Sequence, residues 1–147
     1  MLDSNMFDEV VDENIDRSLL QNHDATFYAT PIQREELNEA GGARGRELLN
    51  IFHDITDKTQ NSIFTFDTKG AGFGDGAFAT EKQGKVYSNI REEHAPGESE
   101  DANMSAVAIA ERVTFVTADE RLQNALERTY PNSYLKSEEF ISKLEGN

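Results

Sequence analysis

The sequence contains no cysteine, which excludes disulfide bonds and zinc sites built from thiolates. It also has no apolar run near the length of a membrane span, and its first residues lack a signal-peptide pattern. The three histidines, His23, His53 and His94, show no metal-ligand spacing, and we expect all three at the surface. These absences lead us to expect a soluble cytoplasmic protein.

Positive charge is also scarce, because 14 basic residues stand against 28 acidic ones and leave a formal net charge of −14. A surface this acidic repels nucleic acid unless cations or a local basic patch intervene. Solubility alone, a basic partner protein or a salt-rich cytoplasm would each account for such a charge. The charge therefore constrains a functional hypothesis without selecting one.

Helical and strand-like patterns alternate along the chain, which predicts one α/β domain over residues 1–147, with a parallel sheet covered by helices on both faces. Strands are expected at about 1–2, 27–29, 63–66, 113–116 and 134–135. Helices are expected at about 7–19, 30–40, 44–55, 99–111, 117–128 and 137–144. A glycine-rich irregular insertion is expected at about 68–97.

Several helix ends carry specific signals. Thr30, Pro31 and Gln33 form a capping box with proline at the first helical position, and Gly41-Gly42 ends that helix. A second capping box is expected at Thr117-Ala-Asp-Glu120. These signals fix where side chains at the helix starts should lie.

The segment from Asp101 to Asp119 is the most informative part of the chain. It has small residues at helical spacing, then the β-branched and aromatic run Val113–Val116, then an aspartate where the strand ends. A helix packed antiparallel on the strand that follows it brings Asp101 and Asp119 to the same end of the sheet. Two carboxylates that converge at this end suggest a metal site.

Two further acids stand at comparable places: Asp3 ends the short first strand, and Glu36 lies on the helix after the second. Open parallel sheets bind ligands beyond the carboxyl ends of their strands. Four carboxylates there would need a cation, and an all-oxygen donor set favours Mg²⁺ or Mn²⁺. Glu35 is the competitor of Glu36 for the fourth place.

The stretches 1–7, 30–37, 101–111 and 116–119, taken in order, resemble the successive motifs of PIN domains, and the separation 119 − 101 = 18 is typical of that family. Only Met1 and Leu2 precede Asp3, where family members usually have several apolar residues. The resemblance implies a three-layer α/β/α sandwich around a parallel sheet. It also implies a ribonuclease that cuts RNA phosphodiester bonds and, as in VapC-type toxins, an antitoxin partner and a homodimer.

By position, the resemblance makes Asp3, Glu36, Asp101 and Asp119 the catalytic and metal-binding residues. Asn5 and Thr117 match polar companions that orient the first and last aspartates.

Candidate contacts to RNA phosphates are basic residues outside these motifs: Arg44, Arg46, Lys69 and Lys82. The glycine-rich insertion is then either a surface loop or a substrate-binding arm, with Phe73 and Phe78 available to stack on bases. The alternative function is a catalytically silent PIN-like module that binds nucleic acid or protein.

Overall fold

The computed structural model describes residues 1–22, 24–63, 76–94 and 99–146. Its helices are α1 (Ser4–Val11), α2 (Arg17–Gln21), α3 (Pro31–Glu39), α4 (Gly42–Ile55), α5 (Glu81–Glu93), α6 (Ser99–Ala110), α7 (Glu120–Thr129) and α8 (Ser137–Leu144). Its strands are β1 (Tyr28–Ala29), β2 (Lys58–Thr59), β3 (Ser62–Ile63), β4 (Gly76–Ala77), β5 (Phe115–Thr117) and β6 (Tyr134–Lys136). The mixed α/β class is confirmed, and helices dominate it.

All described strand pairs are parallel, as the alternating pattern predicted. They form three two-stranded sheets, β1–β2, β3–β4 and β5–β6. The chain start adds a bridge beside β5, because Leu2 pairs with Val116 in parallel. Two backbone hydrogen bonds support this bridge, from Val116 N to Met1 O (2.9 Å) and from Asp3 N to Val116 O (2.8 Å). The expected first strand is therefore present as a stub next to β5.

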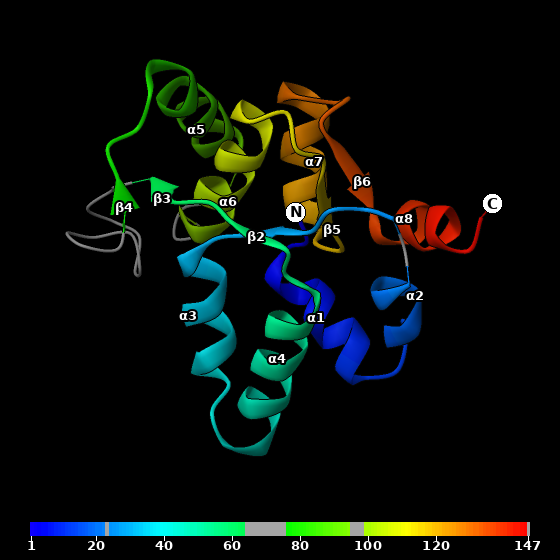
Figure 1. The fold of residues 1–147 in the computed structure, drawn as a ribbon. Coiled ribbons are helices and arrows are strands. Elements are labelled where there is room, and N and C mark those ends of the chain that lie inside the picture. The colour runs from blue at the N-terminus through cyan, green and yellow to red at the C-terminus, as the bar shows by residue number, and fades with distance from the viewer. Residues whose placement is uncertain (23, 64–75, 95–98, 147) are drawn as a thin grey trace.

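The buried apolar residues form two clusters. One joins the chain start to α1, α2, α4 and α8, and the other joins α5, α6 and α7 to Phe115 of β5. Figure 1 shows the first four helices gathered on one side of the strands and α5, α6 and α7 on the other. In α6, the small residues Ala102, Ala106 and Ala108 are fully buried, which permits the close packing that their spacing predicted.

Most predicted helix starts and stops are confirmed. Thr30 N donates to Gln33 Oε1 at 2.9 Å, which forms the Gln33 half of the first capping box. Gly41 and Gly42 both have positive φ, at 62° and 56°, so the turn between α3 and α4 needs residues without a side chain. Among the described residues, no helix has both the length and the apolar character needed to cross a membrane.

The expected single helix at 7–19 is wrong. The chain leaves the helix at Asp12, and Glu13 has a φ of 61°. Asp16 then caps α2 by accepting from Ser18 N at 2.8 Å. The apolar spacing in the sequence continues across this break, because Ile15 lies between the two helices and is still buried in the core.

The expected irregular insertion at about 68–97 is also wrong for its second half, since α5 covers Glu81–Glu93. Thr80 and Gln83 form a capping box, and Val86 and Ile90 bury one turn apart. The capping box and the apolar spacing are both visible in the sequence, but Gly84 and the charged neighbours weaken the helical pattern. The predicted contributions of residues 64–75, including Lys69 and Phe73, lie outside the described residues.

Candidate metal centre

Five acidic residues line one cavity of about 330 Å³: the four predicted acids Asp3, Glu36, Asp101 and Asp119, and also Asp8. Each comes from a different part of the fold. Asp3 follows the strand stub, and Asp119 follows β5 after one residue. Glu36 lies on α3, and Asp101 lies in the first turn of α6. The structure thus brings together all four sequence-predicted site carboxylates.

Asp3 is the most buried of these acids, with 2% of its surface exposed. One carboxylate oxygen caps α1 by accepting from Ser4 N at 2.7 Å, and the other accepts from the Thr117 hydroxyl at 2.6 Å. Burial, followed by the charge of Asp101, raises the pKa of Asp3 to about 7. A carboxylate oxygen has more than one lone pair, so these bonds leave room for a cation.

Thr117 connects the first and last aspartates. Its hydroxyl donates to Asp3 and accepts from Asp119 N at 3.0 Å, while Asn5 Nδ2 lies at 3.5 Å from the same oxygen. Asn5 Oδ1 also lies 3.4 Å from Ala118 N. These contacts place Asn5 and Thr117 where the predicted polar companions should be. Thr117 is the last residue of β5 and does not cap the helix that follows.

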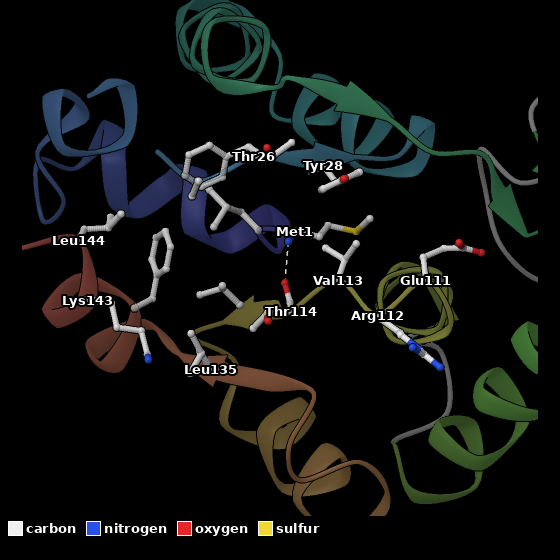
Figure 2. A pocket seen from close by; sticks show the side chains of 15 residues that line it. Met1, Thr26, Tyr28, Glu111, Arg112, Val113, Thr114, Leu135, Lys143 and Leu144 are labelled. Atoms are coloured by element: carbon white, nitrogen blue, oxygen red, sulfur yellow. Dashed lines mark hydrogen bonds between the residues drawn. The ribbon is translucent and has the colours of Figure 1, made fainter. Parts of the chain in front are cut away.

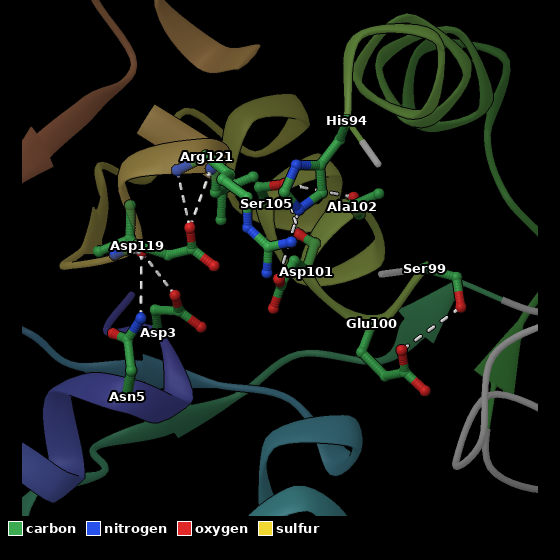
Figure 3. A network of polar contacts seen from close by, with 12 residues as sticks. Asp3, Asn5, His94, Ser99, Glu100, Asp101, Ala102, Ser105, Asp119 and Arg121 are labelled. Atoms are coloured by element: carbon green, nitrogen blue, oxygen red, sulfur yellow. Dashed lines mark hydrogen bonds and ion pairs between the residues drawn. The ribbon is translucent and has the colours of Figure 1, made fainter. Parts of the chain in front are cut away.

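Asp119 caps α7 instead, with one carboxylate oxygen accepting from Arg121 N at 2.8 Å and Leu122 N at 3.2 Å. The capping box expected to start at Thr117 is therefore wrong by two residues. Asp3 and Asp119 are the N-caps of α1 and α7, so each has a structural role in addition to any role in binding. Figure 3 shows both side chains near Asn5, with the Arg121 side chain in the same region.

Glu36 completes the cavity from α3. Burial, helped by the nearby charges of Asp101 and Asp3, raises the pKa of Glu36 to about 8. Ser4 Oγ donates to Glu36 Oε2 and opposes this shift. Glu35 is half-buried beside Arg34 (3.6 Å) and does not line this cavity, so the geometry favours Glu36.

The sequence did not indicate the role of Ser4 near these acids, and it gave the wrong location for His94. Ser4 lies inside the Asp3-Ser-Asn5 motif but showed no signal of its contact with Glu36. His94 was expected at the surface, yet it is buried at the end of α5, and its Nε2 lies 3.5 Å from Asp101 Oδ2. The segment 95–98 separates His94 from α6, and no periodicity indicated that His94 turns inward. Of the other histidines, His53 is exposed, as expected, and His23 lies outside the described residues.

The donor set suits a hard divalent cation, since it consists of carboxylate oxygens with hydroxyl and amide neighbours. Burial and the charge of Asp101 raise the pKa values of Asp3 and Glu36, and a bound cation would relieve this electrostatic cost. However, among the described residues no group of three or more acidic or histidine side chains is already arranged to hold an ion. Asp3 and Asp119 are held by their cap bonds, and Glu36 accepts a hydrogen bond from Ser4 Oγ.

The candidate phosphate-binding residues differ in what they contact. Arg44 bridges two acids of the α1 region, with Nη2 2.5 Å from Asp8 Oδ1 and Nη1 2.9 Å from Asp12 Oδ1. Lys82 donates to the carbonyl oxygen of Ala110 at 2.7 Å. Arg46 is exposed on α4, and Lys69 lies outside the described residues.

No protein-family model matches this chain, and no curated protein is significantly similar to it.

Proposed function

We propose that the protein is a Mg²⁺- or Mn²⁺-dependent endoribonuclease of the PIN type. One observation carries the proposal: all four predicted carboxylates, each from a separate element, line one cavity beside the points where the strand stub and β5 end. Ligands of parallel sheets bind at this edge. The proposal also accounts for Asn5 and Thr117, which contact the acids at the strand ends.

The proposed fold is the three-layer sandwich of that family. The strand stub, β5 and β6 form its parallel centre. The helices of the two core clusters form its outer layers. Asp3, Asp101 and Asp119 would be held by these layers at one edge.

In the proposed site, Asp3, Asp101 and Asp119 would hold the cation, and Glu36 would be a further ligand or would position a water molecule. When bound, the divalent cation would supply charge to polarise the scissile phosphate and to activate a water. The protein contributes the orientation of the acids. The Thr117 hydroxyl donates a hydrogen bond to the Asp3 carboxylate and accepts one from Asp119 N. The same bonds prevent Asp3 from rotating away from the cavity.

Because the net charge is −14, RNA affinity would have to come from a small number of basic side chains. Arg46 is exposed and available on α4, whereas Arg44 and Lys82 already hold contacts within the protein. A basic antitoxin would complement the acidic surface. That partner and a homodimer belong to the same proposal.

A silent PIN-like binding module is the second candidate. The specific observation in its favour is that the described carboxylates are not yet arranged to hold an ion. Such a module would keep the cavity and its caps without turnover.

Cleavage of a fluorescent single-stranded RNA separates the two candidates. Wild-type protein with Mn²⁺ should cut the RNA, a chelator should stop cleavage, and Asp119→Asn should reduce the rate by at least about a hundredfold. The matched control is Glu138→Gln, an acid exposed on α8 and outside the cavity, which should cut like wild type. Chelator-insensitive cleavage, or equal rates for Asp119→Asn and wild type, would exclude the metal-dependent nuclease.

A further inference from the structure

A second cavity, of about 200 Å³, lies at the start of α3 and shares no lining residue with the carboxylate cavity. The residues that line it come from the start of α3, the end of α4 and β2: Thr30, Pro31, Arg34, Phe52, His53, Thr56 and Thr59. Cavities for drug-sized ligands measure roughly 300–1,000 Å³. The volume of this cavity therefore suits a small polar group better than a whole nucleotide.

The charge of this cavity is unusual for the protein. In the part of the chain that the structure describes, its lining contains two basic side chains, Arg34 and His53, and no carboxylate. Four other cavities each include at least one acid, such as Glu111 in the groove beside Met1 that Figure 2 shows. In a chain with a net charge of −14, a cavity with basic and hydroxyl groups but no acid favours an anion.

The start of α3 adds to this preference. The helix has nine residues and no acid in its first turn. The N–H groups of a first helical turn lack partners within the helix and carry partial positive charge, so they bind anions. Arg34 Nη2 lies 3.6 Å from Glu35 Oε1, which is too long for a hydrogen bond, so the guanidinium remains available to an anion in the cavity.

The Thr30 hydroxyl is a buried polar group that needs a partner. Thr30 is fully buried, and its N–H donates to Gln33 Oε1 at 2.9 Å. Its Oγ1 has the capping-box position toward Gln33 N, but it forms no hydrogen bond there or elsewhere within the described residues. A buried hydroxyl without a hydrogen bond destabilises the folded state. A ligand with acceptor oxygens at this cavity would remove that cost.

We propose that this cavity binds a phosphate group. The phosphate oxygens accept a hydrogen bond from the Thr30 hydroxyl and lie at the positive end of α3, and one of them pairs with the Arg34 guanidinium. His53 supplies a donor from the α4 side, because an imidazole keeps at least one N–H in either protonation state. The same chemistry would recognise inorganic phosphate and a phosphate of an RNA strand.

Titration of inorganic phosphate with metal-free protein, followed by phosphorus NMR, tests the site. Wild type should bind phosphate, and Thr30→Val and Arg34→Gln should each bind it at least about tenfold more weakly. The matched control is Arg128→Gln, which removes the same charge from an exposed residue of α7 outside the cavity and should bind like wild type. Absence of binding by wild type, or equal affinity of wild type and Thr30→Val, would overturn the proposal.

A labelled single-stranded RNA, in the presence of a chelator, identifies the source of the phosphate. If Thr30→Val also weakens RNA binding, the site holds a phosphate of the RNA backbone. Unchanged RNA affinity, with weakened binding of inorganic phosphate, assigns the site to free phosphate or a small phosphate ester. Either result supports the site, and neither depends on RNA cleavage or on metal, so failure of this proposal is separate from failure of the proposed nuclease.

Thermal unfolding separates binding from a purely structural role of Thr30. Valine has nearly the shape of threonine, so in phosphate-free buffer Thr30→Val should melt no lower than wild type, because the hydroxyl has no partner to lose. At equal ionic strength, phosphate should raise the melting temperature of wild type more than that of Thr30→Val. A fall of about 3 °C or more in Thr30→Val without phosphate would show that the hydroxyl caps α3, and it would overturn the proposal.

Discussion

Replacing Asp3 by asparagine should make the metal-free protein more stable at neutral pH and abolish part of its pH dependence. Asp3 is buried, and its pKa rises from 3.8 to about 7 in the folded protein. The folded state therefore binds its proton more tightly than the unfolded state between those values. The contribution of Asp3 to the free energy of unfolding is therefore fully present below its unfolded-state pKa. This contribution is lost as the pH rises through the folded-state pKa.

The size of the effect follows from the two pKa values. Proton linkage gives a loss of about 2.5 kcal/mol from this one carboxyl between pH 5 and pH 7.5. Asparagine is nearly isosteric and cannot ionise, so Asp3→Asn should lack this loss. It should keep an acceptor for Ser4 N or Thr117, although a neutral amide accepts more weakly than a carboxylate.

Urea unfolding in the presence of a chelator, at pH 5 and pH 7.5, measures this difference. Wild type should lose about 2.5 kcal/mol more than Asp3→Asn over this interval. Glu138→Gln, which alters an exposed acid of α8, should follow wild type. The argument from burial is refuted if Asp3→Asn and wild type lose the same stability.

Three further outcomes are expected. Glu36→Gln should reduce RNA cleavage at least about tenfold, while Glu35→Gln should leave it nearly unchanged, as measured by initial rates with Mn²⁺; equal effects would remove Glu36 from the site. Phe115→Ala should lower the free energy of unfolding by about 3–5 kcal/mol, measured by urea unfolding, because this ring is fully buried; a change below about 1 kcal/mol would contradict its place in the core. Arg46→Ala should weaken binding of a short RNA, measured by polarisation at low salt, more than Lys82→Ala does; the reverse order would contradict the contacts described for Lys82.

The sequence predicted those features that local chemistry determines. Thr30, Pro31 and Gln33 start α3 as expected, because proline and a capping side chain act within one turn. Asp101 and Asp119 meet at one cavity because a helix and the strand after it return the chain to the same edge. These features needed no knowledge of distant contacts.

Other features depended on tertiary contacts and were missed. His94 is buried against Asp101 through the packing of α5 on α6, which no local pattern reveals. Glu13 breaks the first helix although apolar spacing continues through Ile15. The expected continuous sheet requires pairing between distant strands, and the described strands pair only in twos beside the Leu2 bridge.

Titration of Mn²⁺ at pH 7.5, followed by the electron paramagnetic resonance signal of the free ion, tests the four-carboxylate cation site most directly. Wild type and Glu138→Gln should bind Mn²⁺ with the same affinity, and Asp101→Asn should bind it at least about tenfold more weakly. The amide cannot supply the negative charge that the cavity offers to a cation. Equal Mn²⁺ affinity of wild type and Asp101→Asn, or no binding by wild type, would contradict the proposed metal centre.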